Sequence, residues 1–179
     1  MRAAEYPGAL WVPAASSNYR TGRRGPPTEA VIHCTDGHPD AMGVAEMWAE
    51  PGHGTSAHFV IGQDATVIQS VSLQDIAWHA HAASFIGIGI EHCARTPGEW
   101  SPRDPGLPPS DAQYLASARL VAWLAKRFGF NPVRGVGVKG HAEADPRTTH
   151  TRCPDGCGWN WELYMGLVAS AYVNSAPTS

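Results

Sequence analysis

The stretch Ala30-Val31-Ile32-His33-Cys34 decides the fold. Its consecutive apolar residues are typical of a strand that is buried on both faces of a sheet. His33 stands at the end of this run, so the strand is expected to carry an imidazole at its end. The chain on either side has the periodicities and turn residues of further strands and helices, and the sequence therefore predicts an α/β fold.

Strands and helices alternate along the chain. The expected strands are 30–34, 57–62, 65–70, 86–93 and 136–138. Residues 57–62 and 65–70 are expected to form a hairpin around Gln63 and Asp64. In the strand 86–93, isoleucines alternate with two glycines and a glutamate, so Glu91 faces away from the isoleucines.

Three helices have recognisable ends. Asp40 can cap a helix that runs to residue 50, Ser110 and Gln113 form a capping box for a helix that ends at Gly129, and Asn160 caps the last helix. The apolar residues expected to face inward are Val44, Met47 and Trp48 in the first helix, Leu115, Ala118, Val121, Ala122, Ala125 and Phe128 in the second, and Leu163, Tyr164, Leu167 and Val168 in the last.

Other segments are expected to be irregular. Residues 1–28 contain a proline-rich and arginine-containing stretch, and residues 96–110 hold five prolines, which exclude a regular element. The loop 96–110 is therefore expected on the surface, as one wall of a groove. Residues 174–179 are expected to fray.

Length and composition indicate one domain over residues 1–179. With 43% hydrophobic residues, a chain of 179 residues can bury one sizeable core and is too short for a second. The net charge is −3 without a run of Lys or Arg, so we expect neither nucleic acid nor an anionic membrane surface as a partner. The first 17 residues lack the uninterrupted apolar stretch of a signal peptide or spanning helix, which favours a soluble cytoplasmic protein.

Two distant segments carry metal-binding residue types. His33 follows the buried strand, and His141 and Cys153 bracket a loop rich in Thr, Asp and Pro. Two imidazoles and one thiolate suit Zn²⁺, and three protein ligands leave the fourth position for water, as in a catalytic zinc site. The sequence therefore predicts a split zinc site and favours hydrolysis.

The cysteines allow other interpretations. Cys153 could pair with Cys157 in a disulfide, although a cytosolic chain disfavours this. Cys34 or Cys153 could act as the nucleophile of a thiol hydrolase with a histidine, but the sequence holds no accompanying signature of such an enzyme. Cys34 points away from His33 in the strand and is expected in the core, as is His58.

Six short motifs occur in a distinctive order. They are Val31-Ile32-His33-Cys34-Thr35, Ser56-Ala57-His58-Phe59, Ala77-Trp78-His79-Ala80, Ile88-Gly89-Ile90-Glu91, Gly140-His141 and Cys153-Pro154. This order resembles the type 2 N-acetylmuramoyl-L-alanine amidases, a family that includes phage lysozyme-amidases and peptidoglycan recognition proteins. The resemblance covers about residues 29–167, and the six motifs together are far more specific than any one of them.

The resemblance implies a fold and a set of site residues. The implied fold is a central mixed β-sheet flanked by α-helices, with a zinc site at one edge of a surface groove. His33, His141 and Cys153 match the family's zinc ligands. Glu91 matches the glutamate of the Ile-Glu motif, and we assign it as general base. Where some relatives carry a catalytic tyrosine, this chain has Ala57, which places more of the proton transfer on Glu91.

The remaining site residues are assigned by position. Thr151 stands two residues before the metal-binding cysteine, where relatives carry Lys or Thr near the developing oxyanion. Arg152 and His150 lie beside it, and which of the three stabilises the oxyanion is left open. Trp78, His79 and Arg152 are substrate-site candidates. Trp78 and His79 match the Trp-His-Ala motif at the groove, although Trp78 could instead belong to the core.

Three classes of function follow from this. The first is a zinc amidase that cuts the bond between N-acetylmuramic acid and L-Ala of peptidoglycan. The second is a recognition module that binds peptidoglycan without cutting it, which the intact ligand set argues against. The third is the thiol hydrolase.

The setting expected for the amidase is that of a phage or prophage endolysin. A monomer without an export signal would stay in the cytoplasm and reach the wall after holin-type release. A cytosolic muropeptide-recycling amidase is the rival. Cys153, in place of the Asp that recycling amidases carry, favours the endolysin.

Overall fold

A six-stranded mixed sheet forms the centre of the computed structural model, which describes residues 3–37 and 39–175. Along the sheet the strands follow the order β1 (Leu10–Trp11), β5 (Val67–Gln69), β4 (Phe59–Ile61), β7 (Gly87–His92), β3 (Glu29–Cys34) and β8 (Val138–Gly140). Only β4 and β5 are antiparallel neighbours, and the other neighbouring strands are parallel. A two-stranded sheet joins β2 (Tyr19–Arg20) to β6 (Ile76–Ala77).

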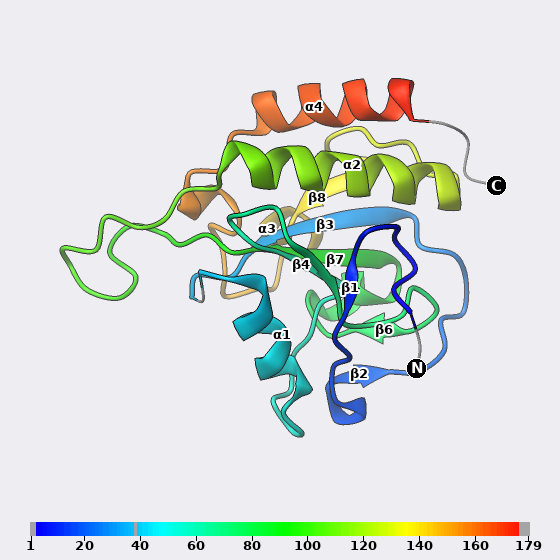
Figure 1. Cartoon of the computed structure of the whole chain (residues 1–179), viewed down its shortest axis with the longest axis horizontal. Coiled ribbons are helices and arrows are strands. Elements are labelled where there is room, and N and C mark those ends of the chain that lie inside the picture. Colours follow the sequence, from blue (N-terminus) through cyan, green and yellow to red (C-terminus); the bar gives the residue numbers. More distant parts are fainter. Residues whose placement is uncertain (1–2, 38, 176–179) are drawn as a thin grey trace.

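Helices cover both faces of the large sheet (Figure 1). On one face lie α2 (Asp111–Phe128) and α4 (Trp161–Asn174), and on the other lies α1 (Ala41–Ala49). Shorter elements are α3 (His141–Ala144) and the 3₁₀ turns η1 (Ser16–Asn18), η2 (His81–Phe85) and η3 (Asp155–Cys157). Among the described residues, no helix combines the length and hydropathy needed to cross a membrane. The expected α/β fold, with a mixed sheet between helices, is confirmed.

The strand β3 is buried along its whole length, as its apolar sequence predicts. It pairs in parallel with β7 on one side and with β8 on the other. The register sets His33 directly opposite Glu91 on β7, and it sets Ile32 opposite Gly140, the last residue of β8. His33, Glu91 and His141 are therefore neighbours at the carboxyl ends of three adjacent parallel strands.

Alternation along the strands separates the core from the site. Ile32, Ile88 and Ile90 belong to the apolar cluster beneath α2 and α4. His33 and Glu91 have the opposite parity and face the other side of the sheet. The same sequence period that builds the core thus directs the polar side chains away from it.

The helix ends form as the sequence predicts. The Ser110 hydroxyl accepts from the N–H of Gln113, the Gln113 side chain accepts from the N–H of Ser110, and Gly129 ends α2 in the left-handed region at φ 75°. Asp40 and Asn160 cap α1 and α4 through their side chains. These ends are local, which is why the sequence predicts them well.

Some expected core positions are exposed. They are Met47, Leu115 and Leu163. On α2 the inner positions beside the apolar residues are taken by polar side chains that have buried partners: Gln113 donates to the carbonyls of Ile61 and Cys93, and Ser117 bonds Tyr164. The prediction that Met47, Leu115 and Leu163 face inward was therefore wrong.

The strand expected at 136–138 lies two residues later. The chain makes a tight turn in which the N–H groups of Val136 and Gly137 donate to the carbonyl of Val133. Gly135 adopts φ 78° in this turn, and Val136 is 59% exposed. The strand consequently starts at Val138, and its end still precedes His141 directly.

The segment 1–28, expected to be irregular, contributes to both sheets through β1 and β2. The Arg23 guanidinium ties it to the rest of the molecule by donating to the carbonyls of Leu73, Phe85 and Gly87. The loop 96–110 has no helix or strand and projects from the molecule (Figure 1). Of the tail expected to fray, Asn174 ends α4, and residues 176–179 lie outside the described residues.

The buried pair Ser117–Tyr164 joins α2 to α4 through a 2.8 Å hydrogen bond between hydroxyls. Tyr164→Phe or Ser117→Ala alone leaves a buried hydroxyl without its partner, and each is expected to lower the free energy of unfolding by about 1–2 kcal/mol. The double variant is expected to lose about 1 kcal/mol less than the sum, as measured by urea denaturation. Strictly additive losses would contradict the coupling.

Candidate active site

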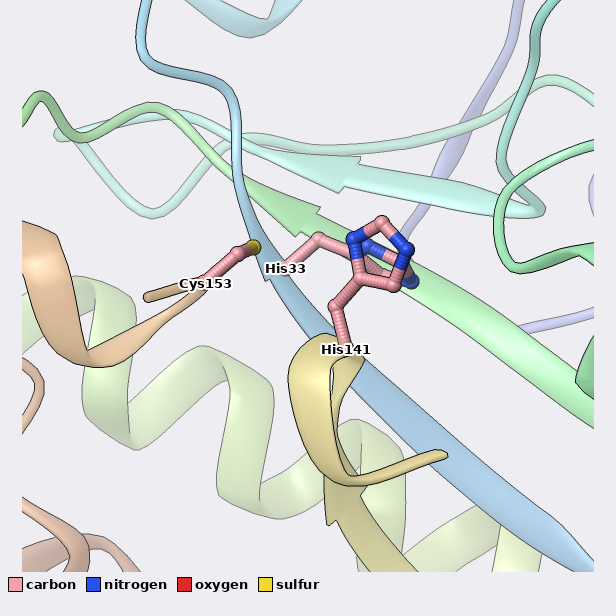
Figure 2. A group of neighbouring side chains, drawn as sticks. All are labelled: His33, His141 and Cys153. Carbon is pink, nitrogen blue, oxygen red and sulfur yellow. The ribbon is translucent and has the colours of Figure 1, made fainter. Parts of the chain in front are cut away.

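Three side chains from distant parts of the sequence converge at the end of β3 (Figure 2). The candidate ligand atoms of His33, His141 and Cys153 all lie within 4.8 Å of one another. His33 comes from β3, His141 begins α3 after β8, and Cys153 lies in the loop that follows α3. The structure thus brings together the three residues that the sequence predicts as metal ligands.

The Gly-His and Cys-Pro motifs fit against each other through Gly140. A Cβ atom at Gly140 would lie 2.8 Å from Cδ of Pro154, so only glycine allows this approach. The N–H of Ala142 donates to the carbonyl of Cys153 at 3.1 Å. This contact fixes the loop that carries Cys153 beside the start of α3.

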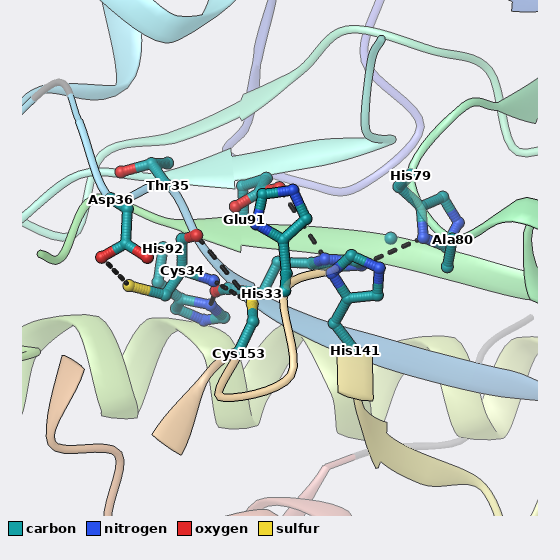
Figure 3. Close-up of polar contacts among 12 residues, drawn as sticks. His33, Cys34, Thr35, Asp36, His79, Ala80, Glu91, His92, His141 and Cys153 are labelled. Atoms are coloured by element: carbon teal, nitrogen blue, oxygen red, sulfur yellow. Dashed lines mark hydrogen bonds and ion pairs between the residues drawn. The ribbon is translucent and has the colours of Figure 1, made fainter. Parts of the chain in front are cut away.

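Neighbouring groups hold two of the candidate ligands, His33 and Cys153 (Figure 3). The Nε2 atom of His33 lies 3.0 Å from Nδ1 of His79, and His92 Nδ1 donates to the His33 carbonyl at 2.9 Å. The N–H of Cys34 donates to the Cys153 sulfur at 3.3 Å, a contact that favours a thiolate. The site is therefore largely preorganised.

Room for His79 comes from a glycine in the neighbouring strand. A Cβ atom at Gly89 would lie 2.5 Å from Cγ of the His79 ring. Gly89 has the same parity as Glu91 on β7, so the strand presents a flat patch beneath the imidazole and a carboxylate next to it. The glycine in the Ile-Gly-Ile-Glu motif thus has a packing reason.

Glu91 faces the candidate ligands across a cavity of about 200 Å³. Its Oε1 atom lies 3.9 Å from Nδ1 of His33. Within the described part of the chain, the buried Oε2 atom has no hydrogen-bond partner. Burial, with a smaller contribution from Asp36, raises the pKa of Glu91 to about 8. This is a carboxylate whose proton affinity suits general acid–base work near neutral pH.

The electrostatics of the ligands suit a cation. Burial and the neighbouring histidines lower the pKa of His33 well below its usual value, and they lower that of His141 to about 4, so both imidazoles are neutral at pH 7. Burial and Glu91 raise the pKa of the Cys153 thiol. A divalent cation would reverse that penalty by stabilising the thiolate. The donor set of two neutral imidazoles and one thiolate fits zinc with an open position.

A larger cavity of about 490 Å³ continues from the small one. The residues lining both are Thr55, Trp78, His79, His141 and His150. The expected groove, with the candidate metal site at one edge, is therefore present. Trp78 is 41% exposed at the junction, so it is not a core residue.

The three residues before Cys153 differ in whether they line the cavities. His150 lines both cavities, and its ring stacks on His141 with 5.6 Å between centroids. Thr151 and Arg152 are exposed and are absent from the lining of both cavities. Their assigned roles in oxyanion stabilisation and substrate binding stay predictions.

The other cysteines and His58 lie outside the cluster of ligands. The four cysteines carry free thiols, so the Cys153–Cys157 disulfide does not form in this structure. Cys34 and His58 are buried, as expected, and His58 accepts from the N–H of Gly89.

Two polar residues near the site were not predicted from the sequence. Asp36 lines the small cavity and raises the pKa of Glu91, and Asp145 lies beside His141. The spacing of four between His141 and Asp145 is a signal for a shared helix face, but it has meaning only once the helix is placed.

The packing at Gly89 gives a testable prediction. In Gly89→Ala the His79 ring must swing away and lose its contact with His33, so the affinity for Zn²⁺ is expected to fall about tenfold in a chelator competition. Gly166→Ala is the control, because its Cβ meets nothing within 4 Å, and it is expected to keep the wild-type affinity. Equal affinities in the two variants would contradict the role given to His79.

Comparisons with known proteins agree with one another. The family model described as N-acetylmuramoyl-L-alanine amidase matches residues 23–156. N-acetylmuramoyl-L-alanine amidase A of Achromobacter lyticus is 35% identical over an alignment that covers 93% of this chain and 96% of that protein.

Solved structures share the fold. A mutant endolysin from Bacillus subtilis has a TM-score of 0.68 at 20% identity, covering 89% of this chain and 97% of that chain. A Se-Met AmpD derivative has a TM-score of 0.66 at 24% identity, covering 94% and 99%. The match to the family model and the identity to the Achromobacter enzyme both indicate the same family. The chain belongs to the N-acetylmuramoyl-L-alanine amidase family and is an amidase that acts on peptidoglycan.

Proposed function

We propose that this amidase is zinc-dependent and hydrolyses the amide between N-acetylmuramic acid and L-Ala of peptidoglycan. The observation that carries the proposal is the convergence of His33, His141 and Cys153 opposite Glu91. The three ligands would hold the ion. When bound, zinc supplies an activated water and polarises the carbonyl of the scissile amide.

Glu91 has the geometry of the proton carrier. Its unpartnered Oε2 atom can accept the proton of an attacking water and then return it to the nitrogen of the leaving L-Ala. Ala57 supplies no phenol to share this work. The raised pKa of Glu91 supports the role, because a carboxylate of ordinary pKa holds a proton poorly at neutral pH.

Stabilisation of the developing oxyanion is proposed for the segment that precedes Cys153. His150 has the support of position, since it lines the cavity and stacks on His141. Thr151 and Arg152 remain the candidates from family position, and they would have to move to reach the cavity.

A thiol mechanism has less support. Burial and Glu91 raise the pKa of Cys153. A contact with the Cys157 thiol, followed by burial, raises the pKa of Cys34, whereas a nucleophilic cysteine needs a lowered pKa. Cys153 is better suited to a metal that makes the thiolate stable.

We further propose that the substrate is the polymeric wall, as for an endolysin held in the cytoplasm until holin-type release. The support is the groove, which extends beyond the ligands along Trp78, His81 and Phe85 and leaves Phe85 52% exposed on its wall. An open groove suits a glycan strand with its stem peptides. Recycling of soluble muropeptides is the alternative, and the fold is shared with both kinds of relative.

Metal dependence is tested by mass spectrometry of peptides released from purified peptidoglycan. Release of stem peptides with free L-Ala amino termini is expected to stop on chelation and to return with Zn²⁺, because three ligands without the ion supply no activated water. Release that persists in the chelated protein would contradict zinc dependence.

The same assay separates the two settings. An endolysin is expected to act on intact sacculi at least as fast as on soluble muropeptides. Activity confined to the soluble fragments would instead identify a recycling enzyme.

Glu91→Gln keeps the size of the side chain and removes its proton affinity. Its kcat is expected to fall by about 10²–10⁴, with the zinc content unchanged, since Glu91 is not among the ligands. Glu46→Gln, at an exposed position on α1, is the control, because it removes the same charge as Glu91→Gln. A Glu91→Gln enzyme with wild-type kcat would exclude the general-base assignment.

A further inference from the structure

Asp145 is a buried carboxylate beside the metal site. It is 3% exposed and follows α3 at the point where the helix ends. Its Oδ1 atom accepts from the N–H of Arg147 at 3.2 Å, and its Oδ2 atom lies 2.5 Å from Nδ1 of His81. A buried carboxylate with both oxygens engaged has a fixed orientation.

The same carboxylate faces the far side of His141. Its Oδ2 atom lies 4.0 Å from Nε2 of His141, and the N–H of Asp145 donates to the His141 carbonyl at 2.9 Å. With Nε2 facing the carboxylate, the other ring nitrogen, Nδ1, faces Cys153 (Figure 2). A negative charge behind a ligating imidazole favours the Nε2–H tautomer and increases the basicity of the ligating atom.

The partner of Asp145 belongs to the wall of the groove. His81 begins η2, lines the larger cavity and is 66% exposed in its side chain. Its backbone lies in the left-handed region at φ 41°, which is unfavourable for a residue other than glycine. The contact with Asp145 helps to offset that cost. One carboxylate thus joins the wall of the groove to a candidate ligand.

We propose that Asp145 is a positioning residue, which fixes the tautomer and orientation of His141 for ligation through Nδ1, and that His81 holds Asp145 in place. The inference rests on the proposed zinc site. It completes a pattern in which each candidate ligand has a partner behind it: His79 behind His33, the N–H of Cys34 behind Cys153, and Asp145 behind His141.

The test measures zinc affinity by chelator competition in the full chain. Asp145→Asn retains the size and the acceptor for the Arg147 N–H but loses the charge, and its affinity is expected to fall about 10–100-fold. Asp145→Glu keeps the charge and is expected to recover part of the loss. Glu46→Gln, with the same change of charge at an exposed position on α1, is expected to match wild type.

Thermal unfolding of the chelated proteins separates positioning from a structural role. If Asp145 is a positioning residue, chelated Asp145→Asn is expected to unfold at nearly the wild-type temperature. The rise in unfolding temperature on adding Zn²⁺ is expected to be smaller than in wild type. If Asp145→Asn does not fold, His81→Asn serves as the test, with an expected loss of affinity of at least threefold.

The inference about Asp145 alone is overturned if the zinc affinity of Asp145→Asn is within twofold of that of Glu46→Gln. Where His81→Asn is the test, a zinc affinity within twofold of that of Glu46→Gln has the same meaning. A wild-type chain that binds no zinc overturns the proposed function and this inference with it.

Discussion

The parallel pairing of β3 with both β7 and β8 is the constraint on which the rest of the structure depends. Its register sets His33 opposite Glu91 and ends β8 one residue before His141. Because parallel strands end at the same edge of a sheet, three chemically active side chains meet without any of them being close in sequence. The apolar faces of the same strands fix the register, since a slip by one residue would turn Ile32 and Ile88 out of the core.

Local signals explain what could be predicted of the fold. The run from Ala30 to Cys34 and the capping box at Ser110 are set by neighbouring residues, and they form as expected. The exposed Leu115 could not be foreseen, because the position of Ser117 depends on Tyr164 in another helix. The strands β1 and β2 likewise depend on partners more than fifty residues away.

For the site, residue type and motif order indicated the candidate ligands, whereas their supports required the structure. His33, His141 and Cys153 carry chemistry that a sequence reveals. The imidazole of His79 lies behind His33 only because Gly89 leaves space on a neighbouring strand. Asp145 has meaning only once η2 is folded against α3 and places His81 beside it. Supports of this kind are contacts between elements, and no local pattern encodes them.

The proposed zinc site consists of two imidazoles and one thiolate of this chain and leaves one position open. X-ray absorption at the zinc edge of the loaded protein tests this ligand set. We expect one sulfur at about 2.3 Å with two imidazole nitrogens and one further light atom at about 2.0–2.1 Å. In Cys153→Asp the sulfur shell is expected to disappear. A zinc site without sulfur, or one whose sulfur survives in Cys153→Asp, would contradict this ligand set.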